Sequence, residues 1–379
     1  MLKMSRYRWF LVVSSVLVLC AMLSCVTKKG EEVISEEPAL QRLVSRKLLE
    51  HARLKIQWET KLPIRATERL ERLFILGNHI YALSDHNYVV SLNKETGHEI
   101  FSQSFAPAGY TMLGLELYKD ELDKDELISI IGNSLVEINP EFGTEFRSKS
   151  LGFGVTCPAA RNSSYFYLAG VDKRLRVLRA KDKVELFKVG AEKIITSVIA
   201  DDDFVVFSTD AGNVISMRPD KPNRLWQFEA GDGIVGPMLR DGESLFVASK
   251  DTYVYKLNLQ HGRTPVWKYQ TGGILDVSPR VTREVVYQYV RYRGLSAIDK
   301  NSGALIWQLP EGVDLLAEAN GKAYVITNAG TLVVMDNKKA KRLYLVNFAR
   351  VSKYATNVTD SKIYIADEAG RIACLRPVK

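Results

Sequence analysis

The chain has 379 residues, of which 46% are hydrophobic and 25% are charged, and this composition excludes a largely disordered protein. The formal net charge of +8 is a small excess of 52 basic over 44 acidic residues. The sequence has no basic stripe interleaved with aromatic residues, which nucleic-acid binding proteins carry. We therefore expect a folded body with a solvated surface and no nucleic-acid partner.

Residues 1–25 have the layout of an export signal. Basic residues near the start precede an apolar run over residues 9–23, and Ser24 and Cys25 then stand before a polar stretch. A charged start, an apolar middle and a small residue before a break are typical of secretory signals. Cys25 resembles the lipid-modified cysteine of bacterial lipoproteins. We predict lipidation at Cys25, with an uncleaved membrane anchor and simple secretion as alternatives.

Residues 26–54 are predicted to form a tether and a short amphipathic helix. The stretch 26–37 is charged and poor in aromatic residues, which is typical of a flexible linker. Pro38 suits the first turn of a helix. Apolar residues then follow at three- and four-residue spacing: Leu40, Leu43, Val44 and Leu48. We expect this helix to pack against the body, and the alternative is a partner-binding helix near the anchor.

From residue 55 to 379 the sequence consists of short β-strands that repeat about every forty residues. The stretch 286–307 shows the unit most clearly, with two apolar strands, a Ser302-Gly303 turn and a third strand that ends at Trp307. One apolar strand per unit is marked by Tyr81, Ile128, Tyr167, Val206, Phe246, Tyr287, Tyr324 and Tyr364. An aromatic residue on the outer strand follows at Phe101, Phe146, Phe187, Trp226, Trp267, Trp307 and Tyr344. These repeats predict an all-β protein, an eight-bladed β-propeller with four-stranded blades.

The eighth unit reaches Lys379 soon after its third strand and lacks an outer strand. The segment 56–59, Ile-Gln-Trp-Glu, reads as an outer strand with no blade before it. We predict that this N-terminal strand joins the last blade and closes the ring, which removes exposed sheet edges.

Turn residues fit the same register. Glycines end equivalent two-strand turns in three units, at Gly212, Gly330 and Gly370. The charged run 119–126 lengthens the second unit, and we expect it to be a solvated loop.

The unit resembles the repeat of pyrroloquinoline quinone enzymes. Its parts are a small residue and proline, an apolar strand, a turn ending in glycine, Thr/Ser-Gly, and an outer aromatic residue, and the resemblance covers about residues 56–379. Together with the export signal and Cys25, the chain resembles the BamB family of outer-membrane assembly lipoproteins. The resemblance implies a non-enzymatic scaffold on the periplasmic side of the outer membrane. Its implied partners are the barrel-assembly protein or other envelope proteins, and an inner-membrane anchor is the alternative location.

Three loops are candidate partner-binding sites. The family resemblance implies a basic contact near Lys193 and an acidic contact near Asp232, in loops that lead into the middle blades. The residues themselves suggest a third site, because Arg291 and Arg293 flank Tyr292 at a hairpin tip and could bind carboxylates. The plainer alternative for all three loops is an ordinary solvated surface.

Little in the sequence points to chemistry. Cys157 and Cys374 are expected to be buried free thiols, the five histidines to be surface residues, and Asp276 and Glu318 to be isolated acidic groups. No stretch offers the converging oxygen ligands of a calcium site. We expect no catalytic residue, cofactor or metal. A quinoprotein-type enzyme or sensor and a cell-wall carbohydrate-binding propeller remain alternatives.

Overall fold

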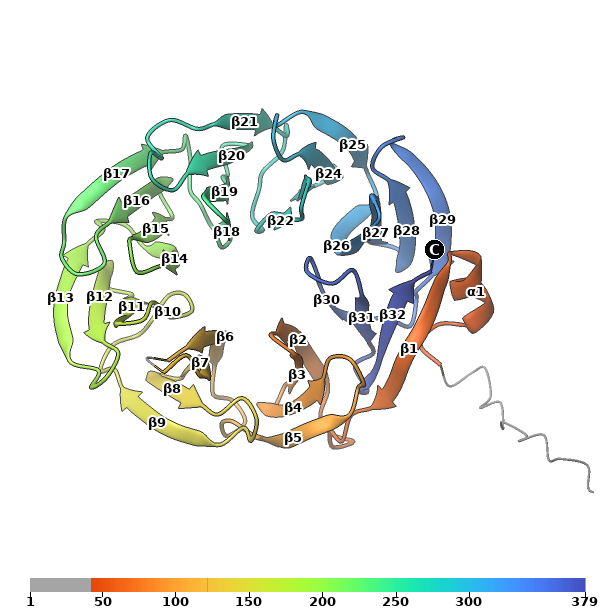
Figure 1. Cartoon of the computed structure of the whole chain (residues 1–379), viewed down its shortest axis with the longest axis horizontal. Coiled ribbons are helices and arrows are strands. Elements are labelled where there is room, and N and C mark those ends of the chain that lie inside the picture. Colours follow the sequence, from red (N-terminus) through yellow and green to blue (C-terminus); the bar gives the residue numbers. More distant parts are fainter. Residues whose placement is uncertain (1–41, 121, 379) are drawn as a thin grey trace, which may run out of the picture. The chain divides into compact units, whose positions relative to one another are not determined.

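The computed structural model describes residues 42–120 and 122–378, and the strands of this part form eight antiparallel sheets of four strands each, arranged as blades around a ring (Figure 1). Blade 1 contains β2 (Leu70–Leu76), β3 (His79–Ser84), β4 (Tyr88–Asn93) and β5 (Glu99–Ser104), and blade 2 contains β6 (Met112–Lys119), β7 (Asp125–Ile131), β8 (Ser134–Ile138) and β9 (Glu145–Ser150). Blade 3 contains β10 (Ala160–Arg161), β11 (Tyr165–Ala169), β12 (Arg174–Arg179) and β13 (Glu185–Gly190), and blade 4 contains β14 (Ile195–Ala200), β15 (Val205–Thr209), β16 (Asn213–Met217) and β17 (Arg224–Glu229). The first strand of each blade is the innermost one.

Blades 5 to 8 follow the same order. Blade 5 contains β18 (Leu239–Asp241), β19 (Ser244–Ala248), β20 (Tyr253–Asn258) and β21 (Trp267–Gln270), and blade 6 contains β22 (Arg280–Val281), β23 (Val285–Val290), β24 (Gly294–Asp299) and β25 (Leu305–Leu309). Blade 7 contains β26 (Gly312–Ala319), β27 (Lys322–Thr327), β28 (Thr331–Asp336) and β29 (Lys341–Asn347), and blade 8 contains β30 (Lys353–Ala355), β31 (Ile363–Ala366), β32 (Arg371–Pro377) and β1 (Leu54–Lys61). The predicted eight-bladed propeller is confirmed. Every predicted apolar marker lies on the second strand of its blade, and every predicted outer aromatic residue lies on the fourth strand.

The apolar core lies between the blades. Eight clusters of buried side chains are found in the described residues, and each joins two neighbouring blades. Tyr287 of blade 6, for example, packs with Leu315 and Val325 of blade 7. A blade therefore buries both of its faces, which explains why the middle strands read as nearly continuous apolar runs.

Tryptophan side chains on outer strands bind the next blade at four places in the described residues. Their indole nitrogens donate to an acceptor on that blade: Trp58 to the Lys94 carbonyl at 3.1 Å, Trp226 to the Leu259 carbonyl at 2.7 Å, Trp267 to the Lys300 carbonyl at 3.0 Å, and Trp307 to Asn337 Oδ1 at 2.9 Å. The outer aromatic residue of the repeat is thus a contact between blades, and its indole N–H is satisfied although the ring is mostly buried.

The two ends of the described body meet in blade 8. β1 pairs antiparallel with β32, and Trp58 lies opposite Cys374. Figure 1 shows the two strands side by side. The predicted ring closure is confirmed.

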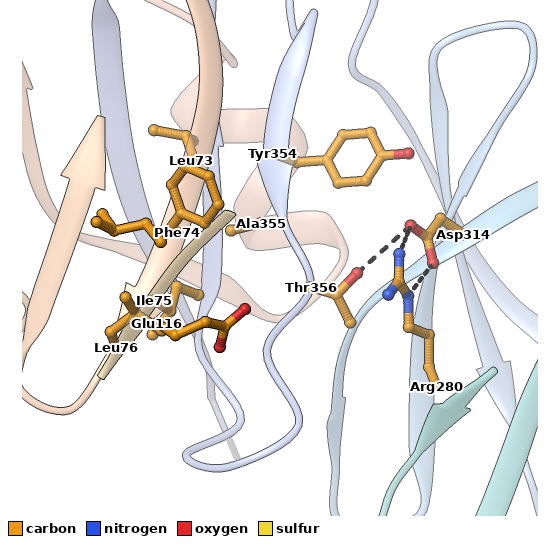
Figure 2. Close-up of a pocket in the computed structure, with 11 residues that line it drawn as sticks. Leu73, Phe74, Ile75, Leu76, Glu116, Arg280, Asp314, Tyr354, Ala355 and Thr356 are labelled. Atoms are coloured by element: carbon orange, nitrogen blue, oxygen red, sulfur yellow. Dashed lines mark hydrogen bonds and ion pairs between the residues drawn. The ribbon is translucent and has the colours of Figure 1, made fainter. Parts of the chain in front are cut away.

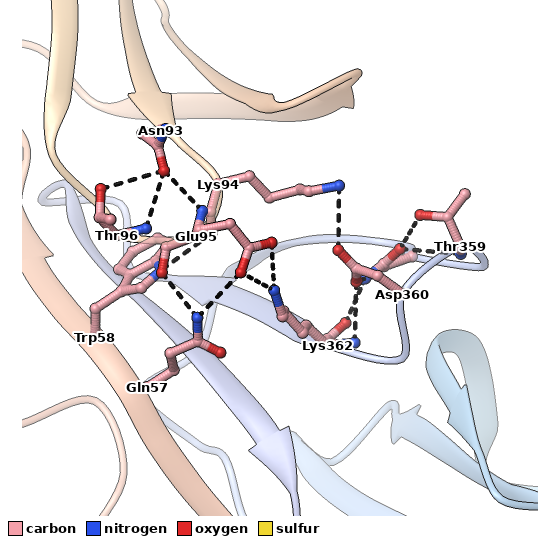
Figure 3. Close-up of polar contacts among 10 residues, drawn as sticks. Gln57, Trp58, Asn93, Lys94, Glu95, Thr96, Thr359, Asp360 and Lys362 are labelled. Carbon is pink, nitrogen blue, oxygen red and sulfur yellow. Dashed lines mark hydrogen bonds and ion pairs between the residues drawn. The ribbon is translucent and has the colours of Figure 1, made fainter.

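Polar contacts reinforce this seam (Figure 3). Lys362, in the β30–β31 loop, reaches both carboxylate oxygens of Glu95 at 2.5 Å, and Lys94 reaches Asp360 at 3.1 Å. Gln57 of β1 donates to the Glu95 carbonyl at 2.7 Å. Segments of blades 8 and 1 that lie far apart in the sequence are therefore held together at one point.

The N-terminal helix is shorter than predicted. α1 spans Arg46–His51, and the expected helix start at Pro38 lies outside the described residues. Leu43 and Val44 are buried but precede the helix, and inside it Leu49 is buried while Leu48 is exposed. The helical spacing counted from Pro38 was wrong because residues 42–44 are not helical. The expectation that this segment packs on the body is confirmed, since it joins the apolar cluster between blades 7 and 8.

Two further expectations need correction. In the charged run 119–126, residues 122–125 are exposed as expected, but Glu126 lies in β7, is 2% exposed and forms an ion pair with Arg161 of blade 3. His79 is not a surface residue, because its side chain is 11% exposed and its ring hydrogen-bonds to the Tyr81 hydroxyl at 2.7 Å. In both cases a neighbouring blade covers the side chain, and the local sequence does not show which residues of that blade lie nearby.

The predicted signal segment, tether and Cys25 lie outside the described residues. Within the residues that are described, no helix has the length and apolar character needed to cross a membrane.

Candidate functional site

The predicted partner-binding residues lie on one face of the ring. Because neighbouring strands are antiparallel, the blade-to-blade connections and the turns between second and third strands emerge on the same side of the sheets. Lys193 lies in the β13–β14 connection, Asp232 in the β17–β18 connection, and residues 291–293 in the β23–β24 turn. We call this side the connecting face.

Lys193 and Asp232 flank the turn at residues 210–212 of blade 4. Ile194 N donates to Asp210 Oδ1 at 3.1 Å, which ties the Lys193 loop to one side of this turn. On the other side, a Cβ at Gly212 would lie 2.5 Å from the Asp232 carbonyl oxygen, and Gly212 has a positive φ of +92°. The basic and acidic candidates are therefore on adjacent loops, and both are exposed.

The side chains of Lys193 and Asp232 differ in the contacts that they make within the protein. The Asp232 carboxylate accepts a 2.6 Å hydrogen bond from Gly233 N, which fixes the side chain on its own loop. Among the described residues no carboxylate lies within ion-pair distance of Lys193. Lys193 thus presents a cation with no internal counter-ion, and Asp232 an anion that is only partly satisfied.

At the tip formed by residues 291–293, one of the two arginines is paired inside the protein. Arg291 forms an ion pair with Asp276 of the neighbouring connection, and this contact raises the pKa of Arg291. The Arg293 guanidinium lies against Gly272, whose added Cβ would be 3.2 Å from its central carbon. Tyr292 is 96% exposed and has a φ of +60° at the turn. The tip therefore offers an exposed aromatic ring and the exposed guanidinium of Arg293, for which the described residues show no ion pair, whereas the Arg291 guanidinium is already paired.

An apolar patch surrounds this tyrosine. Its four members are exposed by at least 40%: Val235, Ile274, Val277 and Tyr292. The loops that carry them touch, because Arg291 N donates to the Ile274 carbonyl at 3.4 Å and a Cβ at Gly236 would lie 2.8 Å from the Val277 carbonyl carbon. We call these four residues the blade 5–6 patch. Asp232 and Arg291 stand beside it in the same loops.

The blade 5–6 patch was not predicted from the sequence. The β17–β18 connection holds the fully buried residue Ile234, and the β21–β22 connection holds the fully buried residue Leu275. Each of these side chains fills the space between two blades. The extra apolar residues beside them, Val235, Ile274 and Val277, have no such space to fill. More than one apolar residue per connection is the signal that could have revealed the patch.

Among the described residues, the thiols and Glu318 singled out from the sequence are buried or hydrogen-bonded. Cys157 and Cys374 are buried free thiols, as expected, and burial raises the pKa of each thiol to about 12. Glu318 accepts hydrogen bonds from Thr282 and Tyr287 at 2.7 and 2.6 Å and is therefore a structural group. In the described part of the chain, no three His, Cys, Asp or Glu side chains meet in a way that could hold a metal ion.

Comparison with solved structures identifies the architecture. The crystal structure of BamB from Moraxella catarrhalis superposes with a TM-score of 0.65 at 12% identity, over 85% of this chain and 97% of that one. The chain has a BamB-like propeller fold. The computationally designed Ika8 protein superposes with a TM-score of 0.63 at 12% identity, over 83% of this chain and 98% of that one. The likeness of the BamB-like propeller to a designed protein underlines that these identities speak for the fold alone.

No protein-family profile matches the chain. No curated protein matches it either.

Proposed function

We propose that this chain is a non-enzymatic, lipid-anchored scaffold of the cell envelope that binds other proteins through its connecting face and serves outer-membrane β-barrel assembly. The observation that carries the proposal is the blade 5–6 patch, an exposed apolar surface on adjacent loops of a BamB-like propeller. Exposed apolar side chains that cluster and are rimmed by charges are typical of protein-binding sites.

The composition of the patch suits a protein partner. Tyr292 is the kind of residue that dominates binding energies, because it buries a large ring at the loss of few rotatable bonds. The loops that carry the patch are held by the ring, so little backbone order has to be gained on binding. Asp232 and Lys193, on neighbouring connections, would add charge selectivity at the edge.

The proposed location follows from the N-terminal sequence. An export signal and lipidation at Cys25 would hold the propeller on the periplasmic side of the outer membrane, and a retained anchor in the inner membrane is the competing arrangement. The barrel-assembly protein is the proposed partner, on the strength of the resemblance to BamB.

Affinity purification of the full chain from detergent-solubilised envelope, followed by mass spectrometry, tests this proposal. We expect the barrel-assembly protein to co-purify with wild type and to be lost with the double variant Val277→Asp/Tyr292→Ala. The matched control is Phe142→Ala, since Phe142 is 69% exposed in the β8–β9 turn on the opposite face. Recovery of no barrel-assembly component, or equal loss in the control, would contradict the proposal.

A further inference from the structure

The net positive charge of the chain is concentrated in two short segments. Residues 42–55 hold five basic residues and one acidic residue, and residues 338–342 hold four basic residues and no acidic one. The excess in these two segments equals the formal net charge of the whole chain, +8, so the remaining sequence is neutral overall. A charge excess that is gathered in one place, rather than spread over the surface, points to an electrostatic contact with an anionic partner.

The fold brings the two segments together between blades 7 and 8. Residues 337–340 form the β28–β29 turn, and α1 packs against β29 and β1 on the outside of the ring (Figure 1). The centre of the His51 ring, at the end of α1, lies 6.0 Å from the centre of the Tyr344 ring of β29. Six exposed cations of the two segments therefore share one stretch of the outer rim, which we call the rim patch: Arg46, Lys47, Arg53, Lys338, Lys339 and Lys341.

The rim patch is not neutralised from within the body. In the described part of the chain, no carboxylate lies within ion-pair distance of any of its six cations. Asp336 accepts instead from the backbone N–H groups of Lys338 and Lys339, at 2.9 and 3.0 Å. By contrast, Arg280 on an inner strand is held by two hydrogen bonds to Asp314, at 3.0 and 2.9 Å (Figure 2). The charge of the rim patch therefore remains available to an anion outside the body.

Several basic residues of this region are placed against the electrostatic preference of the fold. Arg46 and Lys47 begin α1, where the helix dipole favours acidic side chains, and no acidic residue stands in that first turn. Lys55 of β1 lies directly opposite Arg376 of β32, and like charges in such a pair repel each other. Neither arrangement stabilises the propeller, so a benefit from these cations has to come from a contact outside it.

The position of the patch along the chain indicates which anionic surface is near. Sixteen residues, 26–41, separate Arg42 from Cys25, the predicted lipid attachment site. Even a fully extended segment of this length spans at most about 60 Å. The rim patch is thus the part of the body that follows the anchor most closely in the sequence. Clusters of Lys and Arg beside a membrane anchor are attracted to anionic lipid head groups, and the anchor raises their effective concentration at the bilayer.

We propose that the rim patch binds the anionic lipid head groups of the membrane that holds the chain. The choice of a membrane as partner rests on the lipid anchor of the proposed function, whereas the charge of the patch does not. Leu48, 42% exposed on α1 beside these cations, adds an apolar side chain that can enter the head-group region. Because the patch lies on the outer rim, this contact sets the ring on its edge and leaves the connecting face open to protein partners.

Surface plasmon resonance of the full chain, held in immobilised phosphatidylcholine nanodiscs, tests the patch. These discs retain the membrane anchor, so nanodiscs added in solution meet only the body. We expect added discs with about 30% phosphatidylglycerol to bind and pure phosphatidylcholine discs not to bind. Binding should weaken as sodium chloride is raised from about 0.1 M to about 0.5 M, because salt screens exposed charges.

The test variant is Lys47→Gln/Lys339→Gln, which removes one charge from each segment and should weaken binding about tenfold. The matched control is Lys181→Gln/Lys221→Gln. Both control lysines are exposed and have no ion pair in the described residues, and they lie in the corresponding turns of blades 3 and 4. The control should bind the anionic discs as wild type does.

The proposal is overturned by wild type that does not bind the anionic discs, by equal binding of the two kinds of disc, or by equal loss in the two double variants. Poly-L-glutamate is the second analyte, and tighter binding of this polymer than of the anionic discs would assign the patch to an acidic protein instead. A failure of the proposed function is distinguishable, because the barrel-assembly protein would then not co-purify although the anionic discs still bind.

Discussion

At the scale of single residues, close approaches decide which side chain a position accepts. Gly303 lies in the β24–β25 turn with a φ of +74°, and an added Cβ would stand 2.7 Å from the Trp267 ring of blade 5. The glycine is required twice, once by its backbone conformation and once by the indole that packs on it.

Gly303→Ala is therefore expected to destabilise the protein by about 2–4 kcal/mol, through a strained φ and overpacking against Trp267. Gly321→Ala is the matched control, since Gly321 has a φ of +71° but no atom within 4 Å of an added Cβ. The control should lose only about 1 kcal/mol. Chemical denaturation of both variants measures the difference, and equal losses would refute a steric role for Trp267.

Glu116 makes stability depend on pH. Its pKa is raised from 4.5 to about 7 by burial, so the folded state holds a proton that the unfolded state has released. The free energy of unfolding is therefore not lowered by Glu116 at low pH, and it falls as the pH rises from about 4.5 to 7. Relative to wild type, Glu116→Gln should gain on the order of 2 kcal/mol between pH 5 and pH 8. Thermal unfolding of wild type and Glu116→Gln at both pH values checks this, and an equal difference between the two proteins at pH 5 and pH 8 would contradict it.

At the scale of the elements, the blade 2–blade 3 interface uses charge where other interfaces use an aromatic ring. Lys183 occupies the turn position that Gly303 holds in blade 6, and its ammonium reaches Glu137 of blade 2. Glu137 is 1% exposed and also binds Arg147 at 3.1 Å, while the outer aromatic residue Phe146 is 45% exposed. A buried ion pair has taken over the contact that tryptophan makes elsewhere.

Lys183→Met should destabilise this interface by about 3 kcal/mol, because it leaves the buried Glu137 with one partner fewer. The double variant Glu137→Leu/Lys183→Met should recover most of that loss, since apolar residues of similar size can replace a buried ion pair. Denaturation midpoints of the single and double variants provide the comparison. A double variant no more stable than the single one would contradict this account.

The elements also show what sequence reasoning can and cannot reach. Tyr287 and Trp307 belong to a pattern that repeats within each blade, and such a local period was enough to predict the strands, their order and the closure by β1. The pairing of Arg291 with Asp276 and the exposure of Val277 depend on how separate connections pack against each other. The repeat within each blade carries no information on that packing. The loops holding Lys193 and Asp232 could be located from the sequence for the same reason, whereas the blade 5–6 patch could not.

At the scale of the whole molecule, Trp58 joins the two ends of the body. It lies on β1, is 9% exposed and donates to Lys94 of blade 1, while Trp226 makes the same kind of contact inside the ring. Both substitutions to alanine remove a buried indole and are expected to destabilise the protein by about 3–5 kcal/mol.

The two tryptophan variants should differ in where the protein opens. Trp58→Ala should increase amide exchange in β1 and β32, because β1 is the strand of blade 8 that comes from the opposite end of the described chain and Trp58 is its buried aromatic residue at the seam. Trp226→Ala should leave exchange in β1 and β32 unchanged and act between blades 4 and 5. Hydrogen exchange followed by mass spectrometry distinguishes them, and matching exchange patterns would show that the seam is no weaker than any other interface.

The seam also sets the order in which the molecule can be completed. A chain made from its N-terminus presents β1 early, but its partner β32 comes at residues 371–377, almost at the end. Until those residues arrive, blade 8 has no outer strand and blade 1 has no neighbour on one side. Synthesis therefore passes through an open arc whose sheet edges stay unpaired until β32 is made, and unpaired sheet edges are prone to join other chains.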